Sequence, residues 1–166
     1  MELKLIEFNE KYLEDLYEYS SKKEFHQFMQ YAPDKNIEDT RKYWVKKINE
    51  DNSKVYLVKN IYEEKVIGSV VVSKIDLTNL SCNIGYALNP EYWGRGYLKI
   101  ILIEAEIKVS TSFGLERIEA VTMKENTPSR KGLLSAGYVE VGIIPEYYKF
   151  KTKRSDAALY SKILKK

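Results

Sequence analysis

Hydrophobic and polar positions follow two different periods along this chain of 166 residues, and each change of period marks the border of a predicted element. Apolar residues three or four positions apart predict helices over 10–19, 37–49, 97–113 and 127–137. Runs rich in β-branched and aromatic residues predict strands over 3–8, 54–59, 66–73, 81–88, 116–122, 138–144 and 157–164. This order of strands and helices predicts a mixed sheet with helices on both of its faces.

The segment 97–113 has the clearest helical pattern in the chain. Its apolar residues recur at helical spacing: Leu98, Ile101, Leu102, Ala105, Val109 and Phe113. Three further apolar residues, Ile100, Ile103 and Ile107, widen this surface and predict a helix that is buried on more than one side. Gly114 follows at the position where a left-handed cap ends many helices.

Composition limits the classes of protein to which the chain can belong. It is 44% hydrophobic and 31% charged, and its net charge of +3 is too small to favour a nucleic-acid partner. No apolar run approaches membrane-spanning length and no signal peptide is present, so we expect no membrane partner and a cytoplasmic protein. Cys82 is the single cysteine, which excludes a disulfide or a thiolate metal site within one chain. Without a repeat or linker, residues 1–166 are expected to form one domain.

The junction between the strand 81–88 and the helix 97–113 holds the most informative motif. Its sequence runs Asn89-Pro90-Glu91-Tyr92-Trp93-Gly94-Arg95-Gly96-Tyr97-Leu98. Two glycines one residue apart let the backbone turn tightly and leave its N–H groups bare. With the positive end of the helix dipole, these amides form a seat for a phosphate or pyrophosphate. Glycine also occurs in tight turns for structural reasons alone. The prediction of a phosphate site therefore depends mainly on the strand before the glycines and the helix after them.

The chain resembles the GNAT N-acetyltransferase superfamily, and within it most of all the branch of ribosomal-protein-alanine N-acetyltransferases. Members of that branch typically read Pro-x-Tyr-Trp-Gly-x-Gly-Tyr-Ala here, and the chain matches at Pro90, Tyr92, Trp93, Gly94, Gly96 and Tyr97. Downstream, the segment 126–129 followed by Gly137-Tyr138 resembles the Asn-x-x-Ser…Gly-Phe element of the branch. The likeness spans nearly the whole chain. It implies an α/β (α+β) fold with a mixed, mostly antiparallel sheet of about seven strands that is splayed in the middle.

The resemblance implies acetyl-CoA as the cosubstrate, and no metal is expected. The residues implied to contact acetyl-CoA are Tyr86, Leu88, Gly94, Arg95, Gly96, Tyr97, Leu98, Asn126 and Ser129. The amides of 95–98 would hold the diphosphate, and the strand 81–88 would meet the pantetheine.

The chain also departs from the motif, most clearly at Leu98, where the superfamily has Gly or Ala. We expect the Leu98 side chain to point away from the diphosphate or to crowd it. Lys99 would add positive charge near the phosphates or face solvent. Gly85 and Ala87 leave room on one face of their strand, either for a close ligand or for a tightly packed helix.

The implied reaction is direct attack of an amine on the acetyl group. Ser129 matches the serine proposed in the ribosomal branch to protonate the departing thiolate, although such a serine also serves as a helix cap. Asn126 either bonds the cofactor or caps the same helix. Many superfamily members use a tyrosine on this helix as the acid, and Leu133 holds that position here. No base is evident, since Glu91 is expected to face solvent and His26 to lie on a helix surface.

The acceptor is open among a protein N-terminus, a polyamine, an antibiotic and an amino sugar. An α-amino group has a pKa near ~8 and a lysine near ~10.4, so an enzyme without a base acetylates an α-amine more easily. The segments 25–35 and 145–153 are expected to line the acceptor site. The excess of Lys149, Lys151, Lys153 and Arg154 there argues mildly against a polyamine and suits an acidic or phosphate-bearing acceptor. The alternative function is a non-catalytic acetyl-CoA-binding sensor or partner module. The absence of an evident base and the presence of Leu98 in place of Gly or Ala are the reasons for considering it. A homodimer is left open.

Overall fold

The computed structural model describes residues 2–150 and 152–164. Its elements, with η for a short 3₁₀ helix, are β1 (Leu3–Glu7), η1 (Glu10–Tyr12), α1 (Leu13–Ser20), η2 (Glu24–Phe28), α2 (Ile37–Ile48), β2 (Lys54–Asn60), β3 (Lys65–Asp76), β4 (Ser81–Leu88), η3 (Pro90–Tyr92), α3 (Tyr97–Phe113), β5 (Arg117–Met123), α4 (Thr127–Ser135), β6 (Val139–Phe150) and β7 (Lys153–Ile163). The predicted order of strands and α-helices is confirmed.

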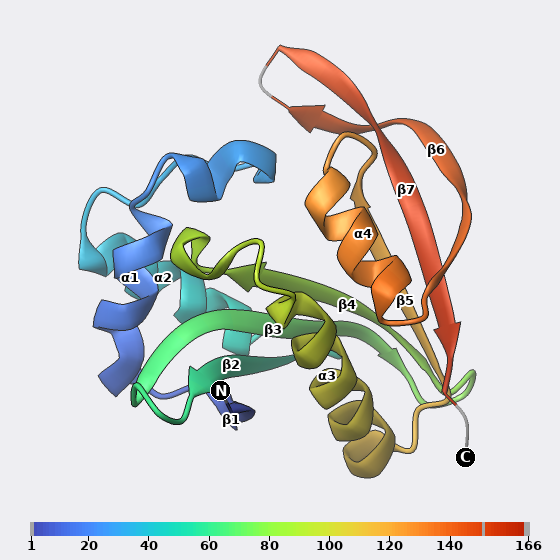
Figure 1. Cartoon of the computed structure of the whole chain (residues 1–166), viewed down its shortest axis with the longest axis horizontal. Helices are drawn as coiled ribbons and strands as arrows, with labels where there is room; N and C mark the ends of the chain where they lie inside the picture. The colour runs from blue at the N-terminus through green and yellow to red at the C-terminus, as the bar shows by residue number, and fades with distance from the viewer. Residues whose placement is uncertain (1, 151, 165–166) are drawn as a thin grey trace.

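One sheet contains all seven strands in the order β1-β2-β3-β4-β5-β7-β6 (Figure 1). Neighbouring strands run antiparallel except β4 and β5, which are parallel and pair only over 81–83 and 117–119. Beyond that short ladder, β4 continues to Leu88 and β5 to Met123 without pairing to each other. The sheet therefore opens into a V between these strands, which confirms the predicted mixed, mostly antiparallel sheet that is splayed in the middle.

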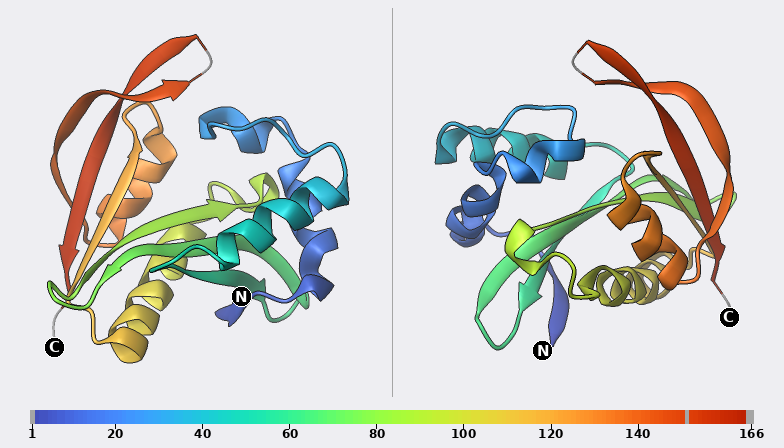
Figure 2. Two further views of the ribbon diagram at one scale, coloured as in Figure 1. Left: turned by 180° about the vertical axis from the view of Figure 1, so that it is seen from behind. Right: turned by 45° about the horizontal axis from the view of Figure 1, so that its top comes forward.

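Helices cover both faces of the sheet, as the sequence predicts (Figure 2). On one face, α1 and α2 pack over a core that includes Leu16, Trp44 and Leu57. On the other face, α3 and α4 pack over a second core that reaches from β3 to β7 and includes Leu102 and Ile118. This second core spans both arms of the V and holds them at a fixed separation.

The last two strands are longer than the sequence predicts. They were expected over 138–144 and 157–164, but β6 runs to Phe150 and β7 begins at Lys153. Their register shifts between Ile144 and Tyr148, next to Pro145, and Glu146 has a positive φ of 51°. These irregularities break the period on which a strand prediction depends.

The prediction that α3 is buried on more than one side is wrong. Ile101, Leu102, Ala105 and Val109 are buried against the sheet, whereas Ile100, Ile103 and Ile107 are 41%, 38% and 54% exposed. The sheet covers one face of the helix, and no described element packs on its outer face as a second layer. Among the described residues, no helix has the length and apolar character needed to cross a membrane.

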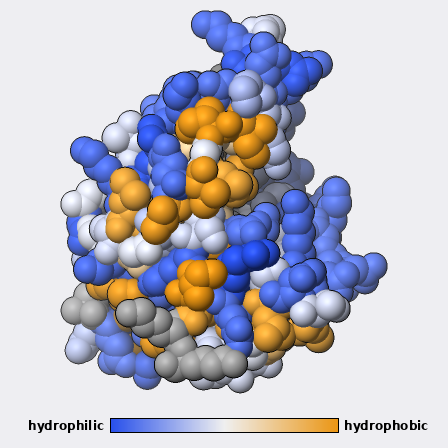
Figure 3. All heavy atoms as spheres, turned by 90° about the vertical axis from the view of Figure 1, so that its right-hand side faces the viewer, coloured by the Kyte–Doolittle hydropathy of each residue, from blue (hydrophilic) through white to orange (hydrophobic). Residues whose placement is uncertain are grey.

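Apolar side chains also remain exposed along the edge strand β6. Val139, Val141 and Ile143 are 66%, 61% and 38% exposed. Figure 3, which looks onto this side of the molecule, shows apolar side chains in orange among blue polar ones. The sheet therefore ends here in a strand that presents several apolar groups to solvent.

Candidate active site

The N-terminus of α3 keeps its backbone amides free. Gly94 and Gly96 have φ of 73° and 77°, in the left-handed region that favours glycine. No atom lies within 4 Å of the position that a Cβ would occupy at either residue, so the space beside the loop is open. Gly96 is the N-cap, no side chain caps the helix, and its first turn holds no acidic residue. Such a helix start attracts an anion.

The helices α1 and α2 begin in a contrasting way. The first turns of α1 and α2 carry the acidic residues Glu14, Asp15, Glu38 and Asp39, which interact favourably with the helix dipole. The first turns of α3 and α4 hold no acidic residue, and Lys99 and Lys131 lie within the first five residues of these helices. Positive charge at this end of a helix is unfavourable unless an anion is bound there.

A cavity of about 720 Å³ lies beside this loop and is bounded by β4, α3 and α4. Eight of the nine residues predicted to contact acetyl-CoA line it: Tyr86, Leu88, Gly94, Gly96, Tyr97, Leu98, Asn126 and Ser129. Arg95 does not line it, and its guanidinium lies 5.6 Å from the centroid of the Tyr92 ring. Lys99 and Lys131 also line the cavity. We refer to it below as the α3 cavity.

Trp93 and Asn89 hold the loop against the end of β4. The indole N–H of Trp93 donates a hydrogen bond to the Leu88 carbonyl at 2.7 Å. Asn89 is fully buried, its backbone N–H donates to the Ile67 carbonyl at 2.7 Å, and its side-chain oxygen accepts from the Glu91 amide at 3.1 Å. The ladder between β3 and β4 stops at Leu88, as expected from Asn89-Pro90.

Leu98 fills a space that a glycine provides on the neighbouring helix. A Cβ added at Gly132 of α4 would lie 2.2 Å from a methyl carbon of Leu98 and 2.8 Å from its Cγ. The side chain is therefore packed between α3 and α4. This agrees with the first of the two expectations, that Leu98 points away from the amides of the loop.

Ser129 reaches across the open V to Tyr86. Its hydroxyl lies 2.8 Å from the Tyr86 hydroxyl, while its own amide donates to the Asn126 side chain at 3.2 Å. Asn126 therefore caps α4, and the Ser129 hydroxyl is free of any capping role. Burial raises the pKa of Tyr86, and the hydrogen bond to Ser129 lowers it only in part, so the phenol stays protonated at neutral pH. Leu133, at the position of the superfamily tyrosine, is fully buried in the core.

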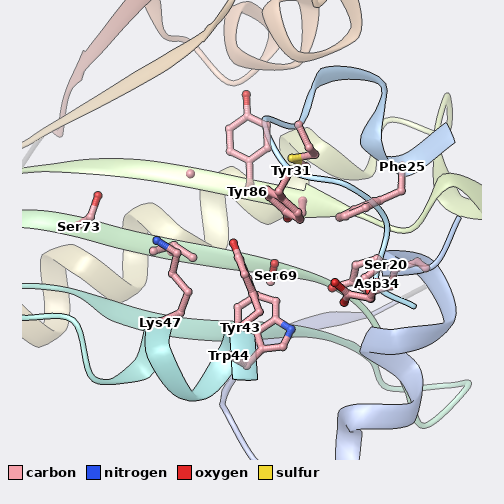
Figure 4. Close-up of a pocket in the computed structure, with 15 residues that line it drawn as sticks. Ser20, Phe25, Tyr31, Asp34, Tyr43, Trp44, Lys47, Ser69, Ser73 and Tyr86 are labelled. Atoms are coloured by element: carbon pink, nitrogen blue, oxygen red, sulfur yellow. The ribbon is translucent and has the colours of Figure 1, made fainter. Parts of the chain in front are cut away.

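A second cavity of about 320 Å³ lies on the opposite face of β4, between α1, α2 and β3 (Figure 4). Gly85 and Ala87 line it, and the nearest atom to a Cβ added at Gly85 is the Val71 carbonyl oxygen at 4.0 Å. These small residues thus leave room for a ligand and not for a packed helix. We refer to this space as the α1–α2 cavity.

The two cavities adjoin at β4, where the V opens. Phe25, Met29, Tyr86 and Ala87 line both of them. Two segments are predicted to line the acceptor site. The segment 25–35 contributes residues to both cavities, whereas none of the described residues of 145–153 lines either one. Their nearest approach to the segment 25–35 is the Lys149 carbonyl, 3.5 Å from the Gln30 side chain. The described basic residues of 149–154 therefore lie outside both cavities, and they do not support an acidic acceptor.

Neither candidate base lies in the cavities. Glu91 is 60% exposed at its side chain and forms an ion pair with Lys22 at 2.5 Å, which lowers its pKa. His26 is 7% exposed, so its predicted surface position is wrong. Its ring nitrogens lie 2.6 Å from the Ser20 carbonyl oxygen and 3.1 Å from that of Tyr31. His26 thus fixes the segment that carries Phe25 and Met29.

The segment 25–35 is predicted to line the acceptor site, and its residues Phe25 and Met29 line both cavities. Sequence reasoning missed Lys131. Lys131 had a usable signal, because it is a basic residue near the start of a helix that lacks first-turn acids. In the part of the chain that the structure describes, no group of three or more His, Cys, Asp or Glu residues lies close enough to hold a metal ion.

Residues 2–139 match the family model described as "Acetyltransferase (GNAT) domain". The chain belongs to the GNAT acetyltransferase family. The match covers strands β1 to β5, the glycine loop and both helices of the α3 cavity, and it confirms the superfamily predicted from the motif. No finding tests the ribosomal-protein-alanine branch, which stays a prediction.

Individual relatives agree with the family. The chain is 35% identical over 98 residues to an uncharacterized N-acetyltransferase, p20, of Bacillus licheniformis; that match covers 59% of the chain and 55% of p20. The chain thus spans about half the length of the curated relatives it matches. Among solved structures it is similar to a spermidine N-acetyltransferase of Vibrio cholerae in complex with CoA and spermine. The TM-score is 0.83 at 17% sequence identity, and the match covers 97% of this chain and 95% of the other. It is also similar to the Microcin C7 self immunity acetyltransferase MccE in complex with acetyl-CoA and AMP. The TM-score is 0.86 at 22% sequence identity, and the match covers 98% of this chain and 93% of the other.

Proposed function

We propose that this protein transfers the acetyl group of acetyl-CoA to a primary amine by direct attack. The observation that carries the proposal is the meeting of two cavities at the open end of β4, where Ala87 and Tyr86 line both. A cosubstrate in the α3 cavity and an amine in the α1–α2 cavity would place their reacting groups at the same point. Proximity of this kind supplies a large part of the catalysis of a two-substrate reaction.

The residues of the α3 cavity fit acetyl-CoA. The open amides of 95–98 at an uncapped helix start suit its diphosphate. Lys99 and Lys131 form no ion pair with any described residue, so their charges are available to its phosphates. Acetyl-CoA supplies the activated acetyl group, and these residues bind and orient it.

Ser129 is the proposed acid. Its buried hydroxyl lines the α3 cavity and is hydrogen-bonded to the Tyr86 hydroxyl. In the reaction the neutral amine nitrogen bonds to the acetyl carbon, the carbon–sulfur bond breaks, and the Ser129 proton goes to the sulfur. The nitrogen loses one proton as the amide forms, and a proton returns to Ser129. Tyr86 acts here as a positioning residue that orients the Ser129 hydroxyl.

No carboxylate base is needed in this scheme. Phe25, Met29 and Ala87 make the junction of the cavities largely apolar. An apolar site disfavours the ammonium form and lowers the pKa of a bound amine. The amine therefore gives its proton to water on entry and attacks as the neutral base. The acceptor class is either a protein N-terminal α-amine, as in the ribosomal branch, or a small amine.

The experiment is isothermal titration with acetyl-CoA, followed by a thiol-release assay over a panel of amines. We expect saturable binding and thiol release with at least one amine. Gly96→Glu places a carboxylate against the bound phosphates, so we expect affinity to fall by more than about 100-fold. Gly114→Glu is the matched control, because Gly114 has a φ of 66° and open space at the other end of the same helix.

Three results would contradict the proposal. Unchanged affinity in Gly96→Glu would show that the nucleotide binds elsewhere. Equal loss in Gly114→Glu would assign the effect to backbone strain. Tight binding without thiol release on any amine would favour the non-catalytic sensor.

A further inference from the structure

The walls of the α1–α2 cavity have an unusual composition. Aromatic side chains from three elements and the loop after η2 surround it: Tyr19, Phe25, Tyr31, Tyr43 and Trp44. Ring contacts connect them, with centroids 4.9 Å apart between Tyr19 and Phe25 and 5.2 Å apart between Tyr31 and Tyr43. The His26 ring, behind the wall, contacts both Phe25 and Tyr31 and joins the two groups. Figure 4 shows Phe25 and Tyr31 beside β4, with Tyr43 and Trp44 on the side of β3 where α2 lies. Such a wall favours a ligand with a ring or another compact apolar body.

The charge of the cavity is set by Asp34. Among the described residues, the charged ones that line it are Asp34 and Lys47, and Lys47 already bonds both carboxylate oxygens of Glu50 at 3.0 Å. Asp34 accepts a hydrogen bond from the Thr40 hydroxyl at 2.6 Å and forms no ion pair with any described residue. The uncompensated charge on the wall is therefore negative, which attracts a cation and repels an anionic acceptor.

The inside of the cavity and its junction with the α3 cavity differ in polarity. Asp34 lies away from the junction, which Phe25, Met29 and Ala87 make apolar. An amine attracted as the ammonium ion thus loses its proton at the point where it meets the thioester.

From these features we infer that the acceptor is a small primary amine with one ring-bearing apolar body, as in arylalkylamines and their cyclohexyl analogues. This rests on the proposed function and names the substrate class of the same site. The ring packs among Tyr31, Tyr43 and Trp44, Asp34 attracts the ammonium form, and the neutral nitrogen reaches the acetyl carbon at β4. The new bond joins that nitrogen to the acetyl carbon, the bond from carbon to sulfur breaks, the nitrogen gives up one proton, and the sulfur takes up one proton.

Other acceptor classes fit the same wall less well. A polyamine presents two or more ammonium groups, and the cavity offers one unpaired carboxylate. A phosphate-bearing amine would place its charge beside Asp34. A peptide brings polar backbone groups into a wall made mainly of rings, where they would lose their hydrogen bonds to water.

The first test compares kcat/KM by thiol release for phenethylamine, cyclohexylethylamine, putrescine, a peptide that begins with alanine, and glucosamine phosphate. We expect phenethylamine and cyclohexylethylamine to exceed each of the other three by about 10- to 100-fold, the gain from burying one ring. Asp34→Asn should raise KM for phenethylamine with little change in kcat. A higher kcat/KM for putrescine, the peptide or the phosphate would overturn the inference.

The second test blocks the cavity. Gly85→Leu adds a side chain where only the Val71 carbonyl lies nearby, so we expect at least a tenfold loss of kcat/KM for phenethylamine with acetyl-CoA affinity unchanged. Gly142→Leu is the matched control, since Gly142 is also a strand glycine, has open space around it and lies outside both cavities. Unchanged transfer in Gly85→Leu would overturn the inference while the proposed function stands. If the wild-type protein did not bind acetyl-CoA, that result would instead overturn the proposed function.

Discussion

Leu98 and Gly132 form a complementary pair between α3 and α4. The superfamily motif has Gly or Ala at the first position, and this chain instead has a leucine whose methyl group occupies the space above a glycine. An extra side chain in a packed contact costs about 1–3 kcal/mol when its neighbours cannot move. The glycine removes that cost. The departure at Leu98 therefore alters the contact between two helices and leaves the amides of the loop in place.

Ser129 and Tyr86 allow a direct test of the proposed proton transfer. Loss of a general acid typically costs about 100-fold or more in rate. We expect Ser129→Ala to lower kcat by about 100-fold, because the departing thiolate loses its proton donor, with KM for acetyl-CoA changed by less than about threefold. Tyr86→Phe should give a smaller loss, since it removes only the partner that orients Ser129. Steady-state kinetics with varied acetyl-CoA measures both.

Ser129→Thr serves as the control, because it keeps the hydroxyl at the same position and should retain most of the rate. A kcat in Ser129→Ala equal to that of the wild type would remove Ser129 from the chemistry. A large rise in KM with constant kcat would assign it to cofactor binding alone.

At the scale of the element, the starts of the helices divide the molecule into two halves. α1 and α2 carry acids in their first turns, as stable helices usually do. α3 and α4 lack acids there, carry lysines nearby and both face the α3 cavity. A bound diphosphate would supply the negative charge that is missing from the first turns of α3 and α4. The two helices are therefore more stable with an anion bound than without one.

The outer face of α3 offers a matched pair of isoleucines. Ile101 is 1% exposed and Ile107 is 54% exposed on the same helix. We expect Ile101→Ala to lower the free energy of unfolding by about 2–5 kcal/mol, since it leaves a cavity in the core. Ile107→Ala should change it by less than about 1 kcal/mol, because its side chain packs little in the folded chain. Urea unfolding followed by circular dichroism measures both values. Equal losses would show that another surface, such as a second copy of the chain, covers this face in solution.

At the scale of the whole molecule, local patterns predicted the elements and missed how distant segments meet. The bounds of β4 and α3 agree with the prediction, because strong periodicity and glycines mark their ends. The contact of Tyr86 with Ser129 joins residues 43 positions apart, and no local pattern contains it. His26 is buried because two backbone carbonyls bond its ring, which a polar residue in a short 3₁₀ helix gives no reason to expect. The glycine loop could be placed from sequence, whereas the aromatic cavity depends on long-range packing.

The arm of the sheet formed by β5, β7 and β6 carries carboxylates that make the molecule sensitive to acid. A hydrogen bond from Tyr160, and then one from Arg130, lowers the pKa of Glu140. Bonds from the Glu146 amide and from Lys124 lower the pKa of Asp156. A pKa that is lower in the folded state means that the unfolded chain binds more protons in acid. These groups therefore stabilise the fold above their unfolded pKa values, and that stability is lost as the pH falls.

We expect the melting temperature to change little from pH 7 to about pH 5 and then to fall steadily towards about pH 3. Glu140→Gln should lower the melting temperature at pH 7, since the charged bonds to Arg130 and Tyr160 weaken, and it should flatten the fall in acid. Glu104→Gln is the control, because Glu104 has no hydrogen-bond or ion-pair partner among the described residues and should leave the acid profile unchanged. Differential scanning calorimetry over this range of pH measures all three profiles. A slope in Glu140→Gln as steep as that of the wild type would place the acid-sensitive groups elsewhere, and the arm would then owe its stability to the core that it shares with α3 and α4.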